Sequence, residues 1–358
     1  MSNYLTGGAA LLSADEAVLL SAMAFWRDVR DLARQFSVRN EAALGERLQE
    51  LHLCQLVEAA GELPDPRERP LESWETWDPI ASHFHLATRD VRYASREQAD
   101  EILERRQARV PPPAALKHTI GDRMHLPAFT HDGAFPEVLL ARRSWRSFGA
   151  RPLTLAEFSD LAGLSFAVQS WAQVKGRCVP LKTSPSGGAC HSIEIYWAVR
   201  DVEHVEPGLY HYGADDHVLT RVSGSWSWER IQTYFPGQPW YGGASAIALM
   251  TSVFGRVQWK YRHPRAYRVI LIEAGHLCQT FCLTATWMGL APFCSAALAD
   301  TEIERDLGID GVSEAVLYAA GVAPRPDGVE WAPSPDSAEH PATVPPAHRG
   351  RVERTEQT

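Results

Sequence analysis

One short segment combines three guanidinium groups with two hydroxyl groups, a set that could bind a phosphate. It reads Arg142-Arg143-Ser144-Trp145-Arg146-Ser147-Phe148. An arginine presents a planar fork of N–H donors that matches phosphate oxygens, and a serine adds a neutral donor. The same residues would also form an ordinary solvated basic face. The segment alone leaves both interpretations open.

A second segment has the composition of a loop that lies against a flat ligand. It runs from Thr183 to Ser192 as TSPSGGACHS, directly before the apolar run Ile193 to Val199. Small residues allow the main chain to approach a ligand closely, and Ser184 and Ser186 can hydrogen-bond at its edge. A plain turn before a strand needs only one or two such residues. The run favours a ligand loop, although it matches neither a Walker loop nor the G-x-G-x-x-G pattern.

The pair Lys260-Tyr261 could move a proton. A lysine desolvated beside a cofactor can have its pKa lowered enough to act as a base, and a neighbouring tyrosine can share or relay the proton. The alternative is structural: a lysine at a strand end with its stem on Trp259, followed by a core aromatic residue. Spacing alone does not separate the two.

The elements that would position these residues belong to two regions. Residues 1–110 have helical patterns: Ser13 with Glu16 forms a capping box whose helix is expected to run through Leu32, and a second helix is expected from Asn40 through Leu56. A charged helix from Ser95 to Val110 ends at three prolines, so residues 111–125 are the expected linker.

Beyond the linker the pattern changes. In residues 126–330, helical stretches alternate with short apolar runs rich in β-branched and aromatic residues, such as Ala244 to Val253. This predicts an α+β domain. Residues 331–358 are rich in proline and contain few aliphatic side chains, so a flexible tail is expected there.

Composition narrows the functional classes. The chain has 358 residues, 45% of them hydrophobic, and 35 Lys+Arg against 44 Asp+Glu give a formal charge of −9. This balance argues against a general nucleic-acid or anionic-membrane binder. The N-terminus has no basic region before its apolar residues, and charged residues interrupt the apolar runs, so we expect a cytoplasmic protein without a membrane span.

The six cysteines do not form a disulfide framework or a recognisable metal motif. Cys278 and Cys282 lie one helical turn apart beside His276, but the surrounding pattern is apolar and no second ligand pair follows. Reduced, mostly buried thiols and no metal site are therefore expected.

The order of four segments carries a resemblance to a known family: RRSWRSF, SPSGGACHSIEIYWAV, EPGLYHY and KYRHPRAYRVILIEAGHLCQ. In this order the chain resembles the nitroreductase superfamily, and within it the SagB-type FMN-dependent azoline dehydrogenases of thiazole and oxazole peptide biosynthesis. The resemblance covers about residues 126 to 325. It implies an α+β, FMN-binding fold with a central, mainly antiparallel sheet flanked by helices, assembled as a homodimer whose flavin sites use both subunits. It also implies a smaller N-terminal accessory module, mainly helical and winged-helix-like.

The resemblance assigns site residues position by position. The first FMN motif, which holds the phosphate and the ring edge, matches Arg142, Arg143, Ser144 and Arg146. The loop over the flavin matches Ser184, Pro185, Ser186, Gly187, Gly188 and His191, with Ser192 where relatives have proline. Ser295 and Ala296 fall where the backbone faces flavin N5, and Arg325 falls where a further phosphate-binding cation is placed.

The hypothesis that follows is oxidation of thiazoline or oxazoline rings in a ribosomally made peptide, with Lys260 as the base, Tyr261 as its partner, flavin N5 as hydride acceptor and oxygen as the final acceptor. The expected partners are the peptide substrate and a cyclodehydratase.

Two alternatives stay open. The same flavin could take electrons from NAD(P)H to reduce a nitro compound or an activated alkene, or the chain could be a catalytically inert scaffold in a biosynthetic complex.

Overall fold

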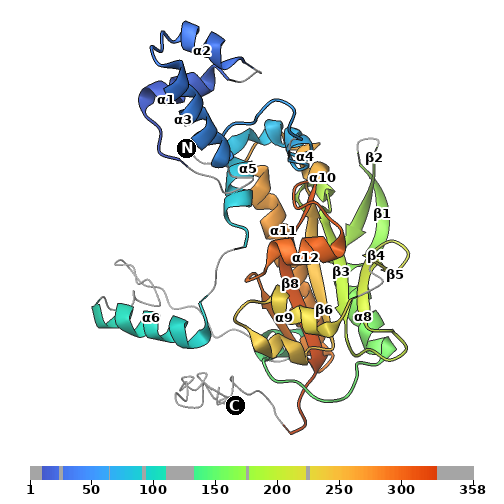
Figure 1. The fold of residues 1–358 in the computed structure, drawn as a ribbon. Helices are drawn as coiled ribbons and strands as arrows, with labels where there is room; N and C mark the ends of the chain where they lie inside the picture. Colours follow the sequence, from blue (N-terminus) through green and yellow to red (C-terminus); the bar gives the residue numbers. More distant parts are fainter. Residues whose placement is uncertain are drawn as a thin grey trace, which may run out of the picture.

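A six-stranded antiparallel sheet forms the centre of the molecule (Figure 1). The computed structural model describes residues 10–23, 27–63, 65–90, 94–109, 133–174, 177–222 and 226–328. The predicted linker, 111–125, and the predicted tail, 331–358, lie outside them. The strand order is β5-β4-β3-β6-β8-β7, and every pair in the sheet is antiparallel. The strands are β3 (Ile193–Val199), β4 (Gly208–Gly213), β5 (Val218–Arg221), β6 (Ala246–Val253), β7 (Leu290–Ser295) and β8 (Glu314–Pro324).

The central strands are buried on both faces, which explains their nearly continuous apolar sequences. In β3 all residues except Glu194 are buried, and in β6 all except Val253 are buried. Strands covered on both sides lose the alternation of apolar and polar residues that half-exposed strands show. In β8, Gly321 leaves room for the Phe293 ring of β7, because a Cβ at this position would collide with that ring.

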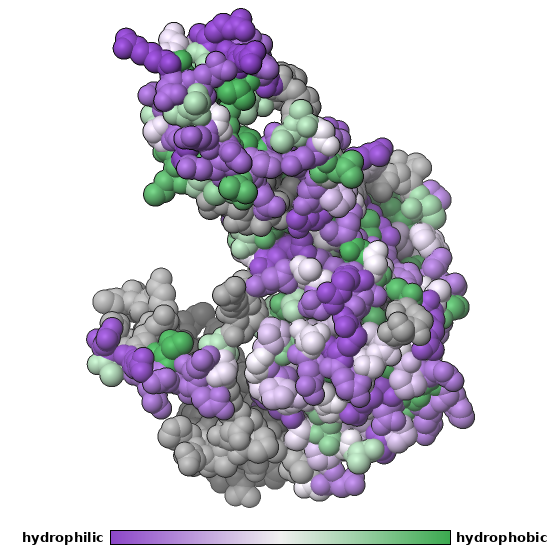
Figure 2. Space-filling view, in the orientation of Figure 1, coloured by the Kyte–Doolittle hydropathy of each residue, from purple (hydrophilic) through white to green (hydrophobic). Residues whose placement is uncertain are grey.

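Helices cover both faces of the sheet (Figure 1). One core contains side chains from α8 (Leu155–Phe166), α10 (Phe254–Gln258) and α11 (Ala266–Trp287), and the other contains side chains from α9 (Ile231–Tyr234) and α12 (Asp300–Leu307). The face over α9 and α12 is mostly hydrophilic (Figure 2). The predicted α+β domain with a mainly antiparallel sheet is confirmed.

Helix α11 is the longest of the described helices and strands, and it links both parts of the candidate site. Its 22 residues are long and apolar enough to cross a membrane by length and composition, although Arg268 and Glu273 interrupt the apolar sequence. In the fold it is a core helix, because Ile270, Phe281 and Ala285 are fully buried. Two further elements flank this region: the hairpin β1 (Val168–Val174) with β2 (Arg177–Lys182), and α7 (Ala134–Ala141), which packs on α11.

The N-terminal region begins with three helices that have their own small core (Figure 1). They are α1 (Ala14–Ser21), α2 (Val29–Gln35) and α3 (Glu41–Leu53). The capping box of Ser13 with Glu16 and the start at Asn40 are confirmed. The expectation of one helix from Ser13 through Leu32 is wrong, because the Asp28 side chain accepts from the Arg30 N–H and starts a new helix. The second helix also ends earlier than expected, at Leu53. The part of residues 10–109 that the structure describes contains no strand, so no wing is seen there.

The following segment packs on the sheet domain. It comprises α4 (Glu68–Glu72), a 3₁₀ turn at Ser73–Trp77 and α5 (Asp78–Ala87). Trp74 and Trp77 are buried in the same core as α10 and α11, and His85 contacts the Tyr267 hydroxyl at 2.8 Å. The charged helix is also present, as α6 (Arg96–Arg109).

Candidate active site

The loop before β3 is held against α11 by a buried carboxylate. Glu273, only 2% exposed, accepts a hydrogen bond of 2.7 Å from the Ser186 hydroxyl and longer ones from the Ser192 hydroxyl and the Ile193 N–H. Burial raises the pKa of Glu273, and the hydrogen bonds oppose that rise. Glu273 is therefore the main anchor of the loop.

Further contacts fix the rest of the loop on the same helix. The Ser184 hydroxyl is buried and lies 2.7 Å from the Thr280 hydroxyl, and the Pro185 carbonyl lies 3.2 Å from Nδ1 of His276. At Gly187 an added Cβ would collide with Val269, so only glycine allows this close approach to α11.

The loop backbone has an unusual conformation. Gly188, Ala189 and His191 all have positive φ angles, of 63°, 52° and 42°. Residues with side chains adopt this region only at a cost of about 1–3 kcal/mol each, and ligand-binding loops are among the places where such residues cluster. The strained loop is thus compatible with the ligand role expected from its sequence.

Lys260 and Tyr261 meet this loop at Gly188. They follow the short helix α10, and Lys260 Nζ donates a hydrogen bond of 2.7 Å to the Gly188 carbonyl oxygen. The ammonium group also lies 5.6 Å from the centre of the Tyr261 ring. A Cβ at Gly188 would collide with both Lys260 Nζ and the Tyr261 hydroxyl. Two groups predicted from separate segments, the Lys-Tyr pair and the flavin loop, therefore lie together.

His191 contributes a neutral imidazole to the loop. It is 8% exposed, and burial, with the nearby charge of Lys182, lowers the pKa of His191 to about 4. At neutral pH it carries no positive charge, so it can hydrogen-bond but cannot neutralise an anion. Its carbonyl oxygen accepts a hydrogen bond of 2.9 Å from Arg256, which also pairs with Glu194.

The arginine segment lies at the other end of α11, along β7. Its backbone is fixed by a 2.9 Å hydrogen bond from the Trp145 N–H to the Pro292 carbonyl. Arg146 is exposed and stacks over the Trp240 ring, whereas Arg143 donates to the Leu140 and Arg142 carbonyls. Neither Arg142 nor Arg146 forms an ion pair with a carboxylate among the described residues. Arg146 and the following residues border a cavity of about 490 Å³, lined by Arg146, Ser147, Phe148, Gly149, Ala150, Arg200, Asp201, Trp240 and Gly243.

The remaining predicted residues lie near this segment. Arg325 stacks over the Trp145 ring and donates to the Leu290 and Thr286 carbonyls, so it caps the C-terminal end of α11. Ser295 is buried at the end of β7 and accepts from the Ala297 N–H, and Ala296 is exposed beside it.

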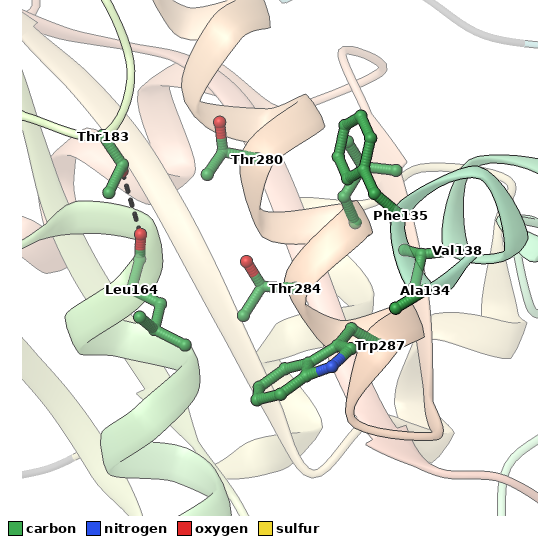
Figure 3. Close-up of a pocket in the computed structure, with 9 residues that line it drawn as sticks. Ala134, Phe135, Val138, Leu164, Thr183, Thr280, Thr284 and Trp287 are labelled. Carbon is green, nitrogen blue, oxygen red and sulfur yellow. Dashed lines mark hydrogen bonds between the residues drawn. The ribbon is translucent and has the colours of Figure 1, made fainter.

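The predicted site residues form two groups along α11. The loop group contacts the helix from Val269, beside Gly187, to Thr280, beside Ser184, and the arginine group reaches Thr286 near its end. Along the helix, the Val269 contact lies about 25 Å from Thr286 and the Thr280 contact about 9 Å from it. Between them lies an open apolar pocket of about 390 Å³ formed by α7, α8 and α11 (Figure 3), lined by Ala134, Phe135, Val138, Leu164, Thr183, Thr280, Leu283, Thr284 and Trp287.

The model of the Nitroreductase family matches residues 139–323, which include both groups except Arg325. The chain belongs to the nitroreductase family. It is 32% identical over 173 residues to the "Putative nitroreductase MJ1384" of Methanocaldococcus jannaschii, covering 48% of this chain and 83% of that relative. The family therefore accounts for the sheet domain and for the order of the predicted motifs.

Two other similarities are to a trifolitoxin-processing protein and to a chain of a microcin synthetase complex. The chain is 32% identical over 145 residues to the trifolitoxin-processing protein TfxB of Rhizobium leguminosarum bv. trifolii, and it spans 38% of the length of TfxB. It also matches a chain in the E. coli microcin synthetase McbBCD complex with truncated pro-MccB17 bound, with a TM-score of 0.51 and 18% identity over 75% of this chain and all of that chain. At this identity the structural similarity shows the fold alone.

The residues present fit FMN. Arg142 and Arg146 form no ion pair with a carboxylate among the described residues, which leaves their guanidinium groups available to a phosphate, and the exposed Gly188 leaves the loop backbone accessible to a flat ring. Glu273 is a site residue that the sequence analysis did not single out, although a lone carboxylate in an otherwise apolar helix was a usable signal for it. Trp77 also supports the site, because its indole N–H donates a hydrogen bond of 2.7 Å to the Tyr261 carbonyl.

Proposed function

We propose that the protein is an FMN-dependent dehydrogenase that oxidises azoline rings in a ribosomally made peptide to thiazoles or oxazoles. The observation that carries this proposal is the convergence of Lys260 and Tyr261 on Gly188 of the Ser-Gly loop. A simple flavin reductase needs a hydride donor and acceptor. A lysine next to a phenol at the ligand loop adds a proton acceptor, which azoline oxidation requires.

Different residues of the chain would bind different parts of FMN. The guanidinium groups of Arg142 and Arg146 would hold the phosphate, and the backbone at Ser295–Ala296 and the loop from Ser184 to Gly188 would lie against the ring. When bound, FMN would supply the hydride acceptor of the reaction. Arg325 would support the site mainly by stacking on Trp145, because its N–H groups already donate to carbonyls at the C-terminal end of α11.

We propose a homodimer with composite sites, because the Gly187 end of the loop, beside Lys260, lies about 25 Å along α11 from the arginine group's contact at Thr286. Large apolar side chains are exposed on α7 and α11 next to the pocket of Figure 3, among them Phe135, Ile272 and Trp287 at 66%, 56% and 61%. Covering such side chains with a second copy is favourable, and it would place one subunit's Lys260 near the partner's arginine segment.

The proton chemistry then rests on Lys260. Converting an azoline to an azole removes one carbon-bound proton and one hydride. Lys260 in its amine form would accept the proton, and Tyr261 would share it by hydrogen bonding. Lys260 is exposed in a single chain, so the desolvation that favours the amine form would come from the second subunit, the cofactor and the substrate.

The choice of a peptide substrate is supported by the relatives. TfxB is a trifolitoxin-processing protein, and the microcin synthetase complex was solved with truncated pro-MccB17 bound. The proposal extends this context to a peptide substrate and to a cyclodehydratase that would form the azolines.

The first experiment is an absorbance spectrum of the purified protein, with any released chromophore identified by mass. We expect flavin bands and about one FMN per chain. The protein is then incubated in air with a peptide that contains thiazolines, and each oxidised ring should lose two hydrogens in mass. A protein that stays colourless with excess FMN would contradict cofactor binding, and a flavoprotein that leaves the azolines unchanged would contradict the substrate.

A second function is favoured by the 32% identity to a relative named as a nitroreductase. In this case NAD(P)H would reduce the flavin, and a nitro compound or activated alkene would receive the electrons. Anaerobic mixing with NAD(P)H separates the two functions: rapid bleaching of the flavin supports the reductase, and bleaching only by the azoline peptide supports the dehydrogenase.

A further inference from the structure

Three thiols meet at one point in the core beside β7. Cys278 and Cys282 lie one turn apart on α11 and are buried, and Cys294 of β7 faces them and is partly exposed. Their three sulfur atoms all lie within 4.8 Å of one another. The sequence showed only the Cys278–Cys282 pair, because Cys294 lies on a different element, β7.

The spacing fits coordination of a thiophilic cation. In a tetrahedral zinc site with Zn–S bonds of about 2.3 Å, the sulfurs lie about 3.8 Å apart. Thiols already within 4.8 Å could close around such an ion by small side-chain adjustments, without movement of α11 or β7. Thiolate ligands select Zn²⁺, Cd²⁺ or Cu⁺ over Mg²⁺ or Ca²⁺.

The neighbouring groups balance the charge of a divalent ion. Three thiolates and one divalent cation carry one net negative charge, and the positively charged Arg142 lies near Cys282 and Cys294. Arg142 has five N–H donors, so it can serve both this cluster and the proposed FMN site.

Tyr318 completes the surroundings of the cluster. Its hydroxyl on β8 donates a hydrogen bond of 3.2 Å to Sγ of Cys294, and both residues are partly exposed. The phenol can therefore orient the sulfur or occupy the fourth position, and an ion can enter from this side.

We propose that Cys278, Cys282 and Cys294 bind one divalent thiophilic cation, Zn²⁺ in the cell, with Tyr318 at the remaining side of the ion. Such a site would tie the middle of α11 to the end of β7, directly before Ser295. The proposal does not depend on the azoline substrate or on FMN, since its ligands are this chain's own side chains.

The test is metal binding by the reduced, full-length protein. The protein is purified, and its zinc content is measured by mass spectrometry. Metal-free protein is then titrated with Cd²⁺ while the ultraviolet charge-transfer absorption of Cd–thiolate bonds is recorded. We expect one metal ion per chain and a charge-transfer band that saturates at one equivalent of Cd²⁺.

Matched cysteine variants locate the site. Cys294→Ser and Cys282→Ser should each weaken Cd²⁺ binding at least about tenfold, whereas Cys178→Ser, at an exposed cysteine outside the cluster, should bind as the wild type does. Circular dichroism checks that each variant is folded. Absence of the Cd–thiolate band in the wild-type protein would overturn the proposal, and so would unchanged binding in folded Cys294→Ser and Cys282→Ser.

Discussion

Lys260 Nζ donates a 2.7 Å hydrogen bond to the carbonyl oxygen of Gly188, and this contact joins the proposed base to the proposed flavin loop. The bond fixes the position of the amine relative to the loop rather than to an acidic side chain. A carboxylate at this place would hold the lysine in its charged form. A neutral carbonyl orients Lys260 without pairing its charge.

Replacing Lys260 with alanine should remove azole formation while FMN stays bound. General-base catalysis contributes about 10²–10⁴-fold to a rate, so turnover should fall by that factor. Flavin content is read from the absorbance spectrum and turnover from the mass of the peptide. Arg262→Ala, at a neighbouring cation, is the control and should keep activity. Normal turnover in Lys260→Ala would rule out the base role.

Gly188→Ala should lower both activity and stability. The added Cβ would collide with Lys260 and Tyr261, and a φ of 63° is unfavourable for alanine by about 1–2 kcal/mol. Gly45→Ala is the matched control, because Gly45 lies inside α3 with open space around its Cβ position, and a helical glycine-to-alanine change stabilises by about 0.5–1 kcal/mol. Urea unfolding and peptide turnover measure both effects. Equal stability of the two variants would contradict the described loop conformation.

Acid should weaken the packing of α5 on the sheet domain through His85. Burial lowers the pKa of His85 from 6.5 to about 4, so between these pH values the unfolded chain binds more protons than the folded one. The neutral imidazole's contribution is complete above pH 6.5 and is lost as the pH falls toward 4, by about 2 kcal/mol at about pH 5. Melting temperatures at pH 7.5 and 5 measure it.

The corresponding control uses two histidine variants. His85→Gln should start less stable at pH 7.5, because it loses the contacts with Tyr267 and Gly311, but its stability should fall less on acidification. His204→Asn, at an exposed histidine, should follow the wild-type pH dependence. If His85→Gln keeps the full acid sensitivity, another group causes it.

Composite sites can be detected by mixing two inactive variants. In a homodimer whose sites use Lys260 of one subunit and Arg146 of the other, a heterodimer of Lys260→Ala with Arg146→Ala contains one site with both defects and one intact site. Each variant alone should be inactive, and the isolated heterodimer should recover about half of the wild-type turnover. No recovery would show that each site uses residues of one subunit only.

The apolar surface on α11 should control the oligomeric state. Trp287→Asp places a charge on the proposed interface and should shift the protein from dimer to monomer in light scattering with size-exclusion chromatography. Leu63→Asp, at a 96% exposed leucine in the N-terminal region, should leave the mass unchanged. A wild-type protein that is already monomeric would contradict the composite site.

Local sequence signals predicted much of this fold. The capping box at Ser13, the helix start at Asn40 and the buried strand Ile193–Val199 are confirmed, because each depends on contacts within a few residues. The helix predicted through Leu32 was wrong, because apolar spacing continues across the break that Asp28 introduces. The apolar periodicity of a sequence does not show where one helix ends and the next begins when both keep the same apolar spacing.

The site was predictable only in its parts. The loop and the Lys-Tyr pair could be named from residue types and family order, yet their meeting at Gly188 depends on the packing of α10 on α11. The contact of Cys294 with Cys278 and Cys282 likewise depends on the packing of α11 against β7. The burial of Glu273 is a further tertiary property, since a helix sequence does not show what covers each residue.

The hydrogen bond from the Trp77 indole to the Tyr261 carbonyl makes the N-terminal region part of the structure that supports the Lys-Tyr pair. Trp77 lies outside the 139–323 segment that the family shares, and its indole fills the core beside α10. A protein shortened to the shared segment would lose the hydrogen bond from Trp77 to Tyr261. It would also expose the apolar core surface beside α10 that Trp77 covers. The segment that the family shares is therefore shorter than the folded unit that supports Lys260 and Tyr261. A shortened form of this chain made for expression or engineering must keep α4 and α5.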